Sequence, residues 1–206
     1  MLERILEIDR ECLLAINGWH APWADTLMWV VSAKATWIPL YVLLVGLLVW
    51  RFRMPTEWRR PCACVRWSLP LCIVLLLGFA VSIGLADWLA SGVLKPCVAR
   101  LRPSHEEGLS GLLHLVRDYR GGLYGFASSH AANTMACAML FALVWKRWWC
   151  ALLLMLWVGL NSYSRMYLGV HYPTDILCGW LIGAVAAWLV YGGIKCLVVL
   201  PEKVRK

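Results

Sequence analysis

Charged residues are scarce in this sequence, at 16% of its 206 positions, whereas a soluble domain carries about 25%. Hydrophobic residues make up 61%, which excludes an intrinsically disordered chain. There is no internal repeat and no low-complexity tract. The nine cysteines are odd in number and lie mostly in or beside apolar runs, which disfavours a disulfide-held secreted domain. The composition predicts a polytopic membrane protein with one domain, residues 1–206.

Acidic residues are the rarer charged class, with 12 against 20 Lys and Arg, for a net charge of +8. Asp, Glu and His residues form no cluster with metal-ligand spacing, and Cys62-Ala-Cys64 is too tight for a zinc pair. We therefore expect no metal and no cofactor. The basic residues alternate with long apolar runs, so they predict membrane topology and no nucleic-acid partner.

Five stretches are apolar and nearly long enough to cross a bilayer, which takes roughly 20 residues. They are residues 25–50, 67–94, 128–146, 148–163 and 174–194. The first 18 residues are interrupted by six charges, and their apolar residues recur at helical spacing. That pattern predicts an amphipathic helix on the membrane surface and not a secretory signal peptide. The expected fold is an all-α bundle of about five membrane-spanning helices with an N-terminal interfacial helix.

Basic residues gather in the connections that follow the first, third and fifth spans. Eleven of the 20 Lys and Arg residues lie there beside two acids, for a net charge of +9, while the rest of the chain totals −1. The positive-inside rule places these connections in the cytoplasm. The loops at residues 95–127 and 164–173 should then face away from the cytoplasm.

Both outward loops and the start of the third span are rich in groups that suit an anion. Lys95, Arg102 and Arg165 are three cations without an equal number of local acids. Such cations are natural ligands of a tetrahedral oxyanion such as phosphate. Ser128 and Ser129 open a helix, where hydroxyls and free backbone N–H groups also favour an anion. A phosphate-binding site is the prediction.

Two histidines and an aspartate add the means for phosphoryl transfer. Of His130 and His171, one can attack phosphorus and the other can protonate the departing oxygen. Asp175 lies four residues after His171, within reach of an imidazole N–H, and can hold the correct tautomer. In this arrangement the three cations would balance the charge that a metal ion balances in other phosphatases.

In chain order the three motifs are Lys95-x6-Arg102-Pro103, then Ser128-x-His130, then Ser164-Arg165-x5-His171-x3-Asp175. Together they resemble the type 2 phosphatidic acid phosphatase superfamily of lipid phosphatases, over residues 95–175. The middle motif departs from the usual Pro-Ser-Gly-His, since Ala127 and Ser129 stand in place of Pro and Gly.

The resemblance implies a role for each matching residue. His171 would be the nucleophile that forms a phosphohistidine, His130 the general acid, and Asp175 the group that orients the nucleophile. The phosphate ligands would be Lys95, Arg102, Ser128 and Arg165, with no metal required.

The resemblance further implies an enzyme of the inner, cytoplasmic membrane whose active site faces away from the cytoplasm. It would remove a terminal phosphate from a lipid phosphate or diphosphate, such as undecaprenyl diphosphate, phosphatidylglycerol phosphate, phosphatidic acid or lipid A phosphate. Two alternatives stay open. One is a lipid phosphotransferase that uses the same intermediate, and the other is a non-catalytic transporter that binds anionic lipids. The oligomeric state is left open.

Two charges, Lys34 and Asp87, fall within the apolar spans, where an ionised side chain is costly and is a candidate for function. The helical rise places both in the outer part of the bilayer. They are expected either to form a structural ion pair or to support Lys95, which lies eight residues after Asp87.

Overall fold

The computed structural model describes residues 2–53 and 69–204. Within these ranges the chain is mostly helical, apart from the long loop between residues 98 and 129. The α-helices are α1 (Leu2–Gly18), α2 (Pro22–Ser32), α3 (Ile38–Arg53), α4 (Leu69–Asp87), α5 (Lys95–Val98), α6 (Ser129–Trp145), α7 (Trp148–Tyr167) and α8 (Pro173–Val204). Short 3-10 turns span Lys34–Trp37, Pro103–His105 and Val116–Asp118, and a π-helical segment, Trp88–Leu94, joins α4 to α5. The predicted all-α bundle is confirmed.

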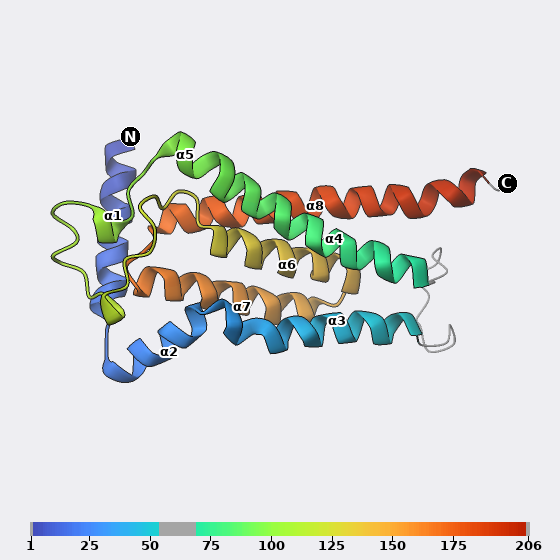
Figure 1. Ribbon diagram of the computed structural model, residues 1–206, viewed down its shortest axis with the longest axis horizontal. Coiled ribbons are helices and arrows are strands. Elements are labelled where there is room, and N and C mark those ends of the chain that lie inside the picture. The colour runs from blue at the N-terminus through green and yellow to red at the C-terminus, as the bar shows by residue number, and fades with distance from the viewer. Residues whose placement is uncertain (1, 54–68, 205–206) are drawn as a thin grey trace.

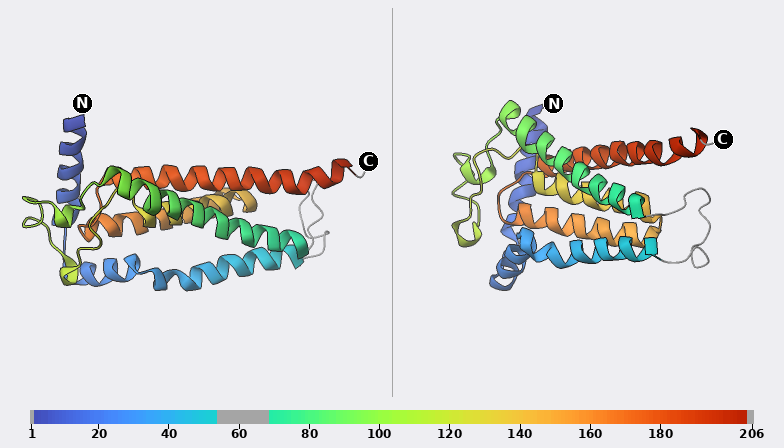
Figure 2. Two further views of the ribbon diagram at one scale, coloured as in Figure 1. Left: turned by 45° about the horizontal axis from the view of Figure 1, so that its top comes forward. Right: turned by 45° about the vertical axis from the view of Figure 1, so that its right-hand side comes forward.

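Helices α3, α4, α6, α7 and α8 run side by side as an elongated bundle, and α1 lies across one end of it (Figures 1 and 2). The long loop between α5 and α6 lies at the same end as α1. Among the described residues, three segments are long and apolar enough to cross a membrane, namely Lys34–Arg51, Cys72–Val98 and Pro173–Cys196, and α6 is a shorter apolar helix. The count of five spans stays a prediction, as does the interfacial position of α1.

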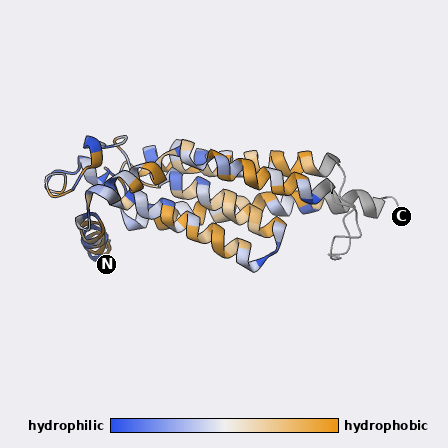
Figure 3. Ribbon diagram, turned by 90° about the horizontal axis from the view of Figure 1, so that it is seen from below, coloured by the Kyte–Doolittle hydropathy of each residue, from blue (hydrophilic) through white to orange (hydrophobic). Residues whose placement is uncertain are grey.

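The outer faces of the bundle are apolar, as Figure 3 shows along its middle. Leu77 on α4 is 60% exposed, and Leu181 on α8 is 65% exposed. Water would penalise such a surface over several helices, whereas lipid chains would not. The outer surface therefore suits a protein that is integral to a membrane.

The prediction of one continuous helix over residues 25–50 is wrong. Helix α2 ends at Ser32, Ala33 is extended, and α3 begins only at Ile38. Pro39 explains the new start, because proline lacks an N–H and its ring clashes with a carbonyl four residues earlier, so it fits only the first turn of a helix. Thr36 Oγ1 and Trp37 Nε1 donate to carbonyls at the end of α2, at 2.5 and 2.7 Å.

The fourth predicted span is four residues too short at its C-terminal end. Helix α7 continues to Tyr167, so Ser164 and Arg165 belong to its last turns and not to the loop. Gly169, at a φ of +69°, ends the helix in the left-handed conformation that glycine adopts without strain. Some predictions lie outside the described residues. They concern the start of the second span at Trp67, the Cys62-Ala-Cys64 pair, and the basic residues Arg59, Arg60, Arg66, Arg205 and Lys206.

Helices α6 and α8 pack closely because small residues line their contact. A Cβ atom on Gly183 would stand 2.3 Å from the carbonyl oxygen of Ala132, and one on Gly179 would stand 2.6 Å from that of Ser128. Small residues four apart are typical of close helix crossings in membranes. This contact sets the distance between the start of α6 and the start of α8, where most of the predicted catalytic residues lie.

Candidate active site

His171 and Asp175 form a buried pair at the start of α8. His171 lies in the turn between α7 and α8 and is 1% exposed, and Asp175 is fully buried. The His171 Nδ1 atom is 3.4 Å from Asp175 Oδ2, which also accepts a hydrogen bond from the Tyr172 backbone N–H at 3.0 Å. In the tautomer that donates from Nδ1, the Nε2 lone pair is free to attack. The predicted contact between the two side chains is present.

The surroundings of His171 favour its neutral form. Burial is the largest cause that lowers the pKa of His171 well below its ordinary value. The positive charges of Arg102, Arg165 and Lys95 lower this pKa further. A neutral imidazole retains the lone pair that a nucleophile needs. These three predicted cations come from separate parts of the chain, and all of them act electrostatically on His171.

Arg102 and Arg165 are both buried and are held by different elements. Arg102 Nε donates to the carbonyl oxygen of Tyr124 at 3.2 Å. A Cβ atom on Gly121 would stand 2.7 Å from Arg102 Nη1, so only glycine leaves this room. Arg165 donates to Ser32 Oγ of α2 and, at 3.5 Å, to the Tyr119 hydroxyl of the long loop.

One nitrogen of Arg165 is left over. Its Nε is buried and has no hydrogen-bond partner in the part of the chain that the structure describes. An unsatisfied buried donor is costly, and a phosphate oxygen would satisfy it. The free donor is consistent with an anion beside Arg165, and its role as a phosphate ligand stays a prediction.

Lys95 and the start of α6 complete the site. Lys95 Nζ donates to Ser129 Oγ at 2.9 Å and to Ser91 Oγ at 3.4 Å. Ser128 caps α6, and its backbone N–H donates to the Asp175 carbonyl at 3.0 Å, which ties α6 to α8. His130, in the first turn of α6, is half-buried and interacts electrostatically with His171 and Arg165.

The ion-pair alternative for Lys34 and Asp87 is wrong. Asp87 instead accepts a hydrogen bond from Asn133 Nδ2 at 2.9 Å, and Lys34 lies exposed in the 3-10 turn after α2. Asp87 does act electrostatically on Lys95. Lys34 acts electrostatically on His130 and Tyr119. The supporting roles of Asp87 and Lys34 therefore stay predictions.

Several residues at the site were not predicted. Arg100 and Asp9 contact the Asp175 region, and Ser32 and Tyr119 hold Arg165. Asp9 had a detectable signal, because Asp9, Leu13 and Asn17 share one face of α1 at spacings of four, and all three are buried. Polar residues at both ends of a buried stripe indicate that the stripe faces protein.

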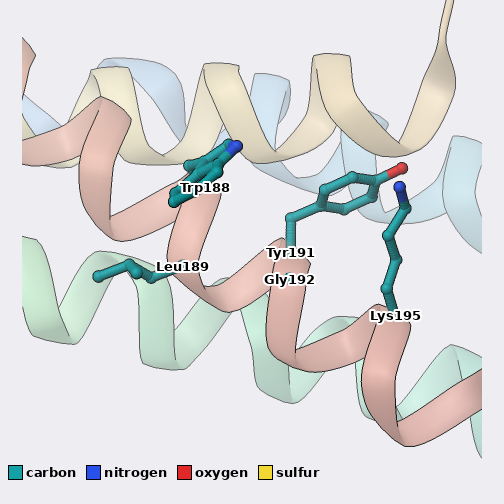
Figure 4. A pocket seen from close by; sticks show the side chains of 5 residues that line it. All are labelled: Trp188, Leu189, Tyr191, Gly192 and Lys195. Atoms are coloured by element: carbon teal, nitrogen blue, oxygen red, sulfur yellow. The ribbon is translucent and has the colours of Figure 1, made fainter. Parts of the chain in front are cut away.

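Other features fall outside the site. Figure 4 shows a hollow on α8 lined by Trp188, Leu189, Tyr191, Gly192 and Lys195. It begins 13 residues after Asp175, which is roughly 20 Å along a helix. In the described ranges no three His, Cys, Asp or Glu side chains gather as a metal site. Metal-independent catalysis remains a prediction.

Comparison with known proteins identifies the family. The model of the PAP2 superfamily matches residues 75–195. Lipid A 4'-phosphatase of Bacteroides thetaiotaomicron is 35% identical over 93% of this chain and 79% of its own length. Lipid A 4'-phosphatase of Porphyromonas gingivalis is 30% identical over 92% of this chain and 74% of its own length.

A solved structure shares the fold. The PAP2-type phosphatidylglycerolphosphate phosphatase of Bacillus subtilis superposes with a TM-score of 0.63 at 20% identity, over 93% of this chain and 87% of that one. The apolar bundle and the phosphatase relatives agree with the motifs read from the sequence. The chain belongs to the PAP2 superfamily and is an integral membrane lipid phosphatase.

Proposed function

We propose that this enzyme removes the 4'-phosphate of lipid A or a closely related glycolipid through a phosphohistidine on His171. The observation that carries the mechanism is a buried histidine, backed by Asp175, on which the charges of Arg102, Arg165 and Lys95 converge. Such a site can bind a phosphate dianion and present a neutral nucleophile to it.

In the first step, His171 Nε2 attacks phosphorus and the bond from phosphorus to the lipid oxygen breaks. His130 donates a proton to that oxygen, so the lipid leaves as a neutral alcohol. Asp175 accepts the Nδ1 hydrogen bond and stabilises the positive charge that develops on the ring. Arg102, Arg165 and Lys95 stabilise the charge on the phosphoryl oxygens.

In the second step, His130, now neutral, removes a proton from water. The hydroxide oxygen bonds to phosphorus, the bond to His171 breaks, and inorganic phosphate leaves. If a lipid hydroxyl replaces the water, the same intermediate makes the enzyme a phosphotransferase. Product analysis separates these two outcomes.

The substrate is proposed from the relatives. Both lipid A 4'-phosphatases align with more than nine-tenths of this chain. We place the active site on the outer face of the inner membrane, where the charge distribution of the loops puts it.

The test is phosphate release in detergent from lipid A, undecaprenyl diphosphate, phosphatidylglycerol phosphate and phosphatidic acid, with and without EDTA. We expect lipid A to lose its 4'-phosphate, to keep its 1-phosphate, and to react equally well in EDTA. Phosphate release only from another lipid would contradict the proposal that lipid A is the substrate. Inhibition by EDTA that Mg²⁺ reverses would overturn the metal-free mechanism.

The intermediate is tested separately with lipid A labelled with ³²P at the 4'-position. We expect acid-labile, alkali-stable label on the wild-type protein and none on His171→Ala, whose rate should fall by at least about three orders of magnitude. The exposed His20→Ala is the matched control and should label normally. A His171→Ala rate within tenfold of the wild-type rate would contradict the assignment of His171 as the nucleophile.

A further inference from the structure

Asp9 of α1 is a carboxylate that is 2% exposed and far in sequence from every motif residue. Its Oδ1 accepts a hydrogen bond from the Thr174 backbone N–H at 2.9 Å, and its Oδ2 accepts one from the Thr174 hydroxyl. The free N–H groups at a helix start favour a negative charge. Asp9, on another helix, therefore caps the start of α8. Its partner there, Thr174, directly precedes Asp175.

Arg100 links Asp9 to the catalytic pair. Its Nη2 donates to Asp9 Oδ2 at 2.9 Å, and its Nη1 lies 3.4 Å from Asp175 Oδ1. The same Nη1 donates to Thr174 Oγ1 at 2.8 Å, and the guanidinium lies 3.8 Å from the centre of the Tyr172 ring. Arg100 is thus fixed on several sides and shares one positive charge between two buried carboxylates.

The two oxygens of Asp175 have separate partners. Oδ2 faces His171 and the Tyr172 N–H, while Oδ1 faces Arg100. Rotation of the carboxyl group would break both sets of contacts at once. Arg100 therefore restricts the orientation of the carboxylate that in turn orients His171.

We propose that Asp9 and Arg100 are positioning residues for the His171–Asp175 pair, so that α1 is a working part of the active site. The proposal rests on the proposed function, because it takes His171 as the nucleophile. Neither residue belongs to the three motifs, and neither touches the phosphate in this proposal.

Charge balance makes the proposal testable. Without Arg100, the carboxylates of Asp9 and Asp175 share no cation, and the charged form of Asp175 loses a stabilising partner. Without the charge of Asp9, Asp175 is the only carboxylate of the two that the positive charge of Arg100 stabilises. Lys95, Arg102 and Cys178 also act on Asp175 electrostatically, but they remain unchanged in both variants.

The two changes should therefore move the acid limb of the kcat profile in opposite directions. That limb reports the His171–Asp175 pair as a unit. We expect Arg100→Met to lower kcat by about 30-fold or more and to move the limb to higher pH. We expect Asp9→Asn to lower kcat by about tenfold and to move the limb to lower pH. KM should change by less than about threefold in both.

If Asp9 and Arg100 only held α1 against the bundle, the result would be different. Loss of docking would lower the thermal unfolding temperature without moving the pH limb. Arg4→Met and Glu7→Gln remove exposed charges from α1 and serve as controls that should match wild type. Arg100→Lys keeps the positive charge but loses the planar guanidinium with its several donors. Compared with Arg100→Met, it should restore the wild-type position of the pH limb but only part of the wild-type kcat.

The measurement is kcat and KM against pH in detergent, with thermal unfolding of each variant and His171→Ala in parallel. If Arg100→Met does not fold, Arg100→Lys and Asp9→Asn decide the question by the same two readouts. Wild-type kcat and pH limbs in Asp9→Asn and Arg100→Met, beside an inactive His171→Ala, would overturn the positioning role alone. An active His171→Ala would overturn the proposed function first.

Discussion

At the scale of single residues, the site combines a neutral histidine with three cations. Burial and then the positive charge around His171 keep a proton off the ring. In the proposed mechanism the same positive charge would also attract the phosphate that the ring attacks. One set of side chains would then serve both binding and activation of the nucleophile, and the unsatisfied buried Nε of Arg165 supports this proposal.

The lowered pKa of His171 predicts how its ring responds to acid. An ordinary histidine gains a proton as pH falls through about 6.5, whereas His171 should stay neutral below that value. Arg102→Gln removes one cause of the shift, so proton uptake should begin at a higher pH in that variant. NMR titration of ¹⁵N-labelled histidine measures both, with Arg117→Gln as an exposed control on the same loop. A wild-type ring that titrates near 6.5 would contradict the prediction.

Ser129, which stands where the family usually has glycine, has a visible role in this structure. Its hydroxyl accepts a hydrogen bond from Lys95 Nζ at 2.9 Å. A hydrogen bond to a charged group contributes about 1.5–3 kcal/mol, so Ser129→Ala should lower kcat/KM by about 10- to 100-fold. Ser91→Ala removes the longer contact, 3.4 Å, and should have a smaller effect. Higher activity in Ser129→Ala would mean that the hydroxyl competes with substrate for Lys95.

At the scale of elements, the active site depends on how closely α6 meets α8. The Ser128 N–H bonds to the Asp175 carbonyl, and Gly179 leaves the space that this approach needs. His130 and Asp175 sit on opposite sides of the same contact. A change in helix spacing would therefore move His130, the proposed general acid, relative to His171, the proposed nucleophile.

Gly179→Ala tests that dependence. The added Cβ would lie 2.6 Å from the Ser128 carbonyl oxygen, so the helices must separate, at a cost of about 1–3 kcal/mol. We expect lower thermal stability and a kcat loss of about tenfold or more. Gly193→Ala lies on the same helix with nothing within 4 Å and should change neither quantity. Equal behaviour of the two variants would show that the spacing of α6 and α8 does not limit catalysis.

The sequence was sufficient for most elements but not for their ends or contacts. Apolar runs predicted α4, α6 and α8, because burial in lipid depends on composition. The break after Ser32 depends on Pro39 and on side-chain contacts of Thr36 and Trp37, which hydropathy does not register. The motifs predicted candidate phosphate ligands, a role that stays a prediction, because their chemistry is local. Asp9 joins the site only through the placement of α1 across the bundle.

At the scale of the whole molecule, the two ends of the bundle differ in chemistry. The end covered by α1 carries the predicted catalytic residues and the long loop (Figure 1). Basic residues mark the opposite end, among them Arg51 at the end of α3 and Lys146 and Arg147 between α6 and α7. The positive-inside rule then predicts that substrate reaches the site from the side away from the cytoplasm.

Labelling of two single cysteines tests this orientation in a variant from which the nine native cysteines have been removed. Glu107→Cys lies exposed on the long loop at the α1 end, and Arg147→Cys lies exposed in the turn at the other end. A membrane-impermeant maleimide should label Glu107→Cys in cells whose outer membrane alone is permeabilised. It should label Arg147→Cys only after the inner membrane is opened, because the positive-inside rule places that turn in the cytoplasm. The reverse labelling pattern would mean that the topology is inverted, so that the active site would receive lipid from the cytoplasmic leaflet.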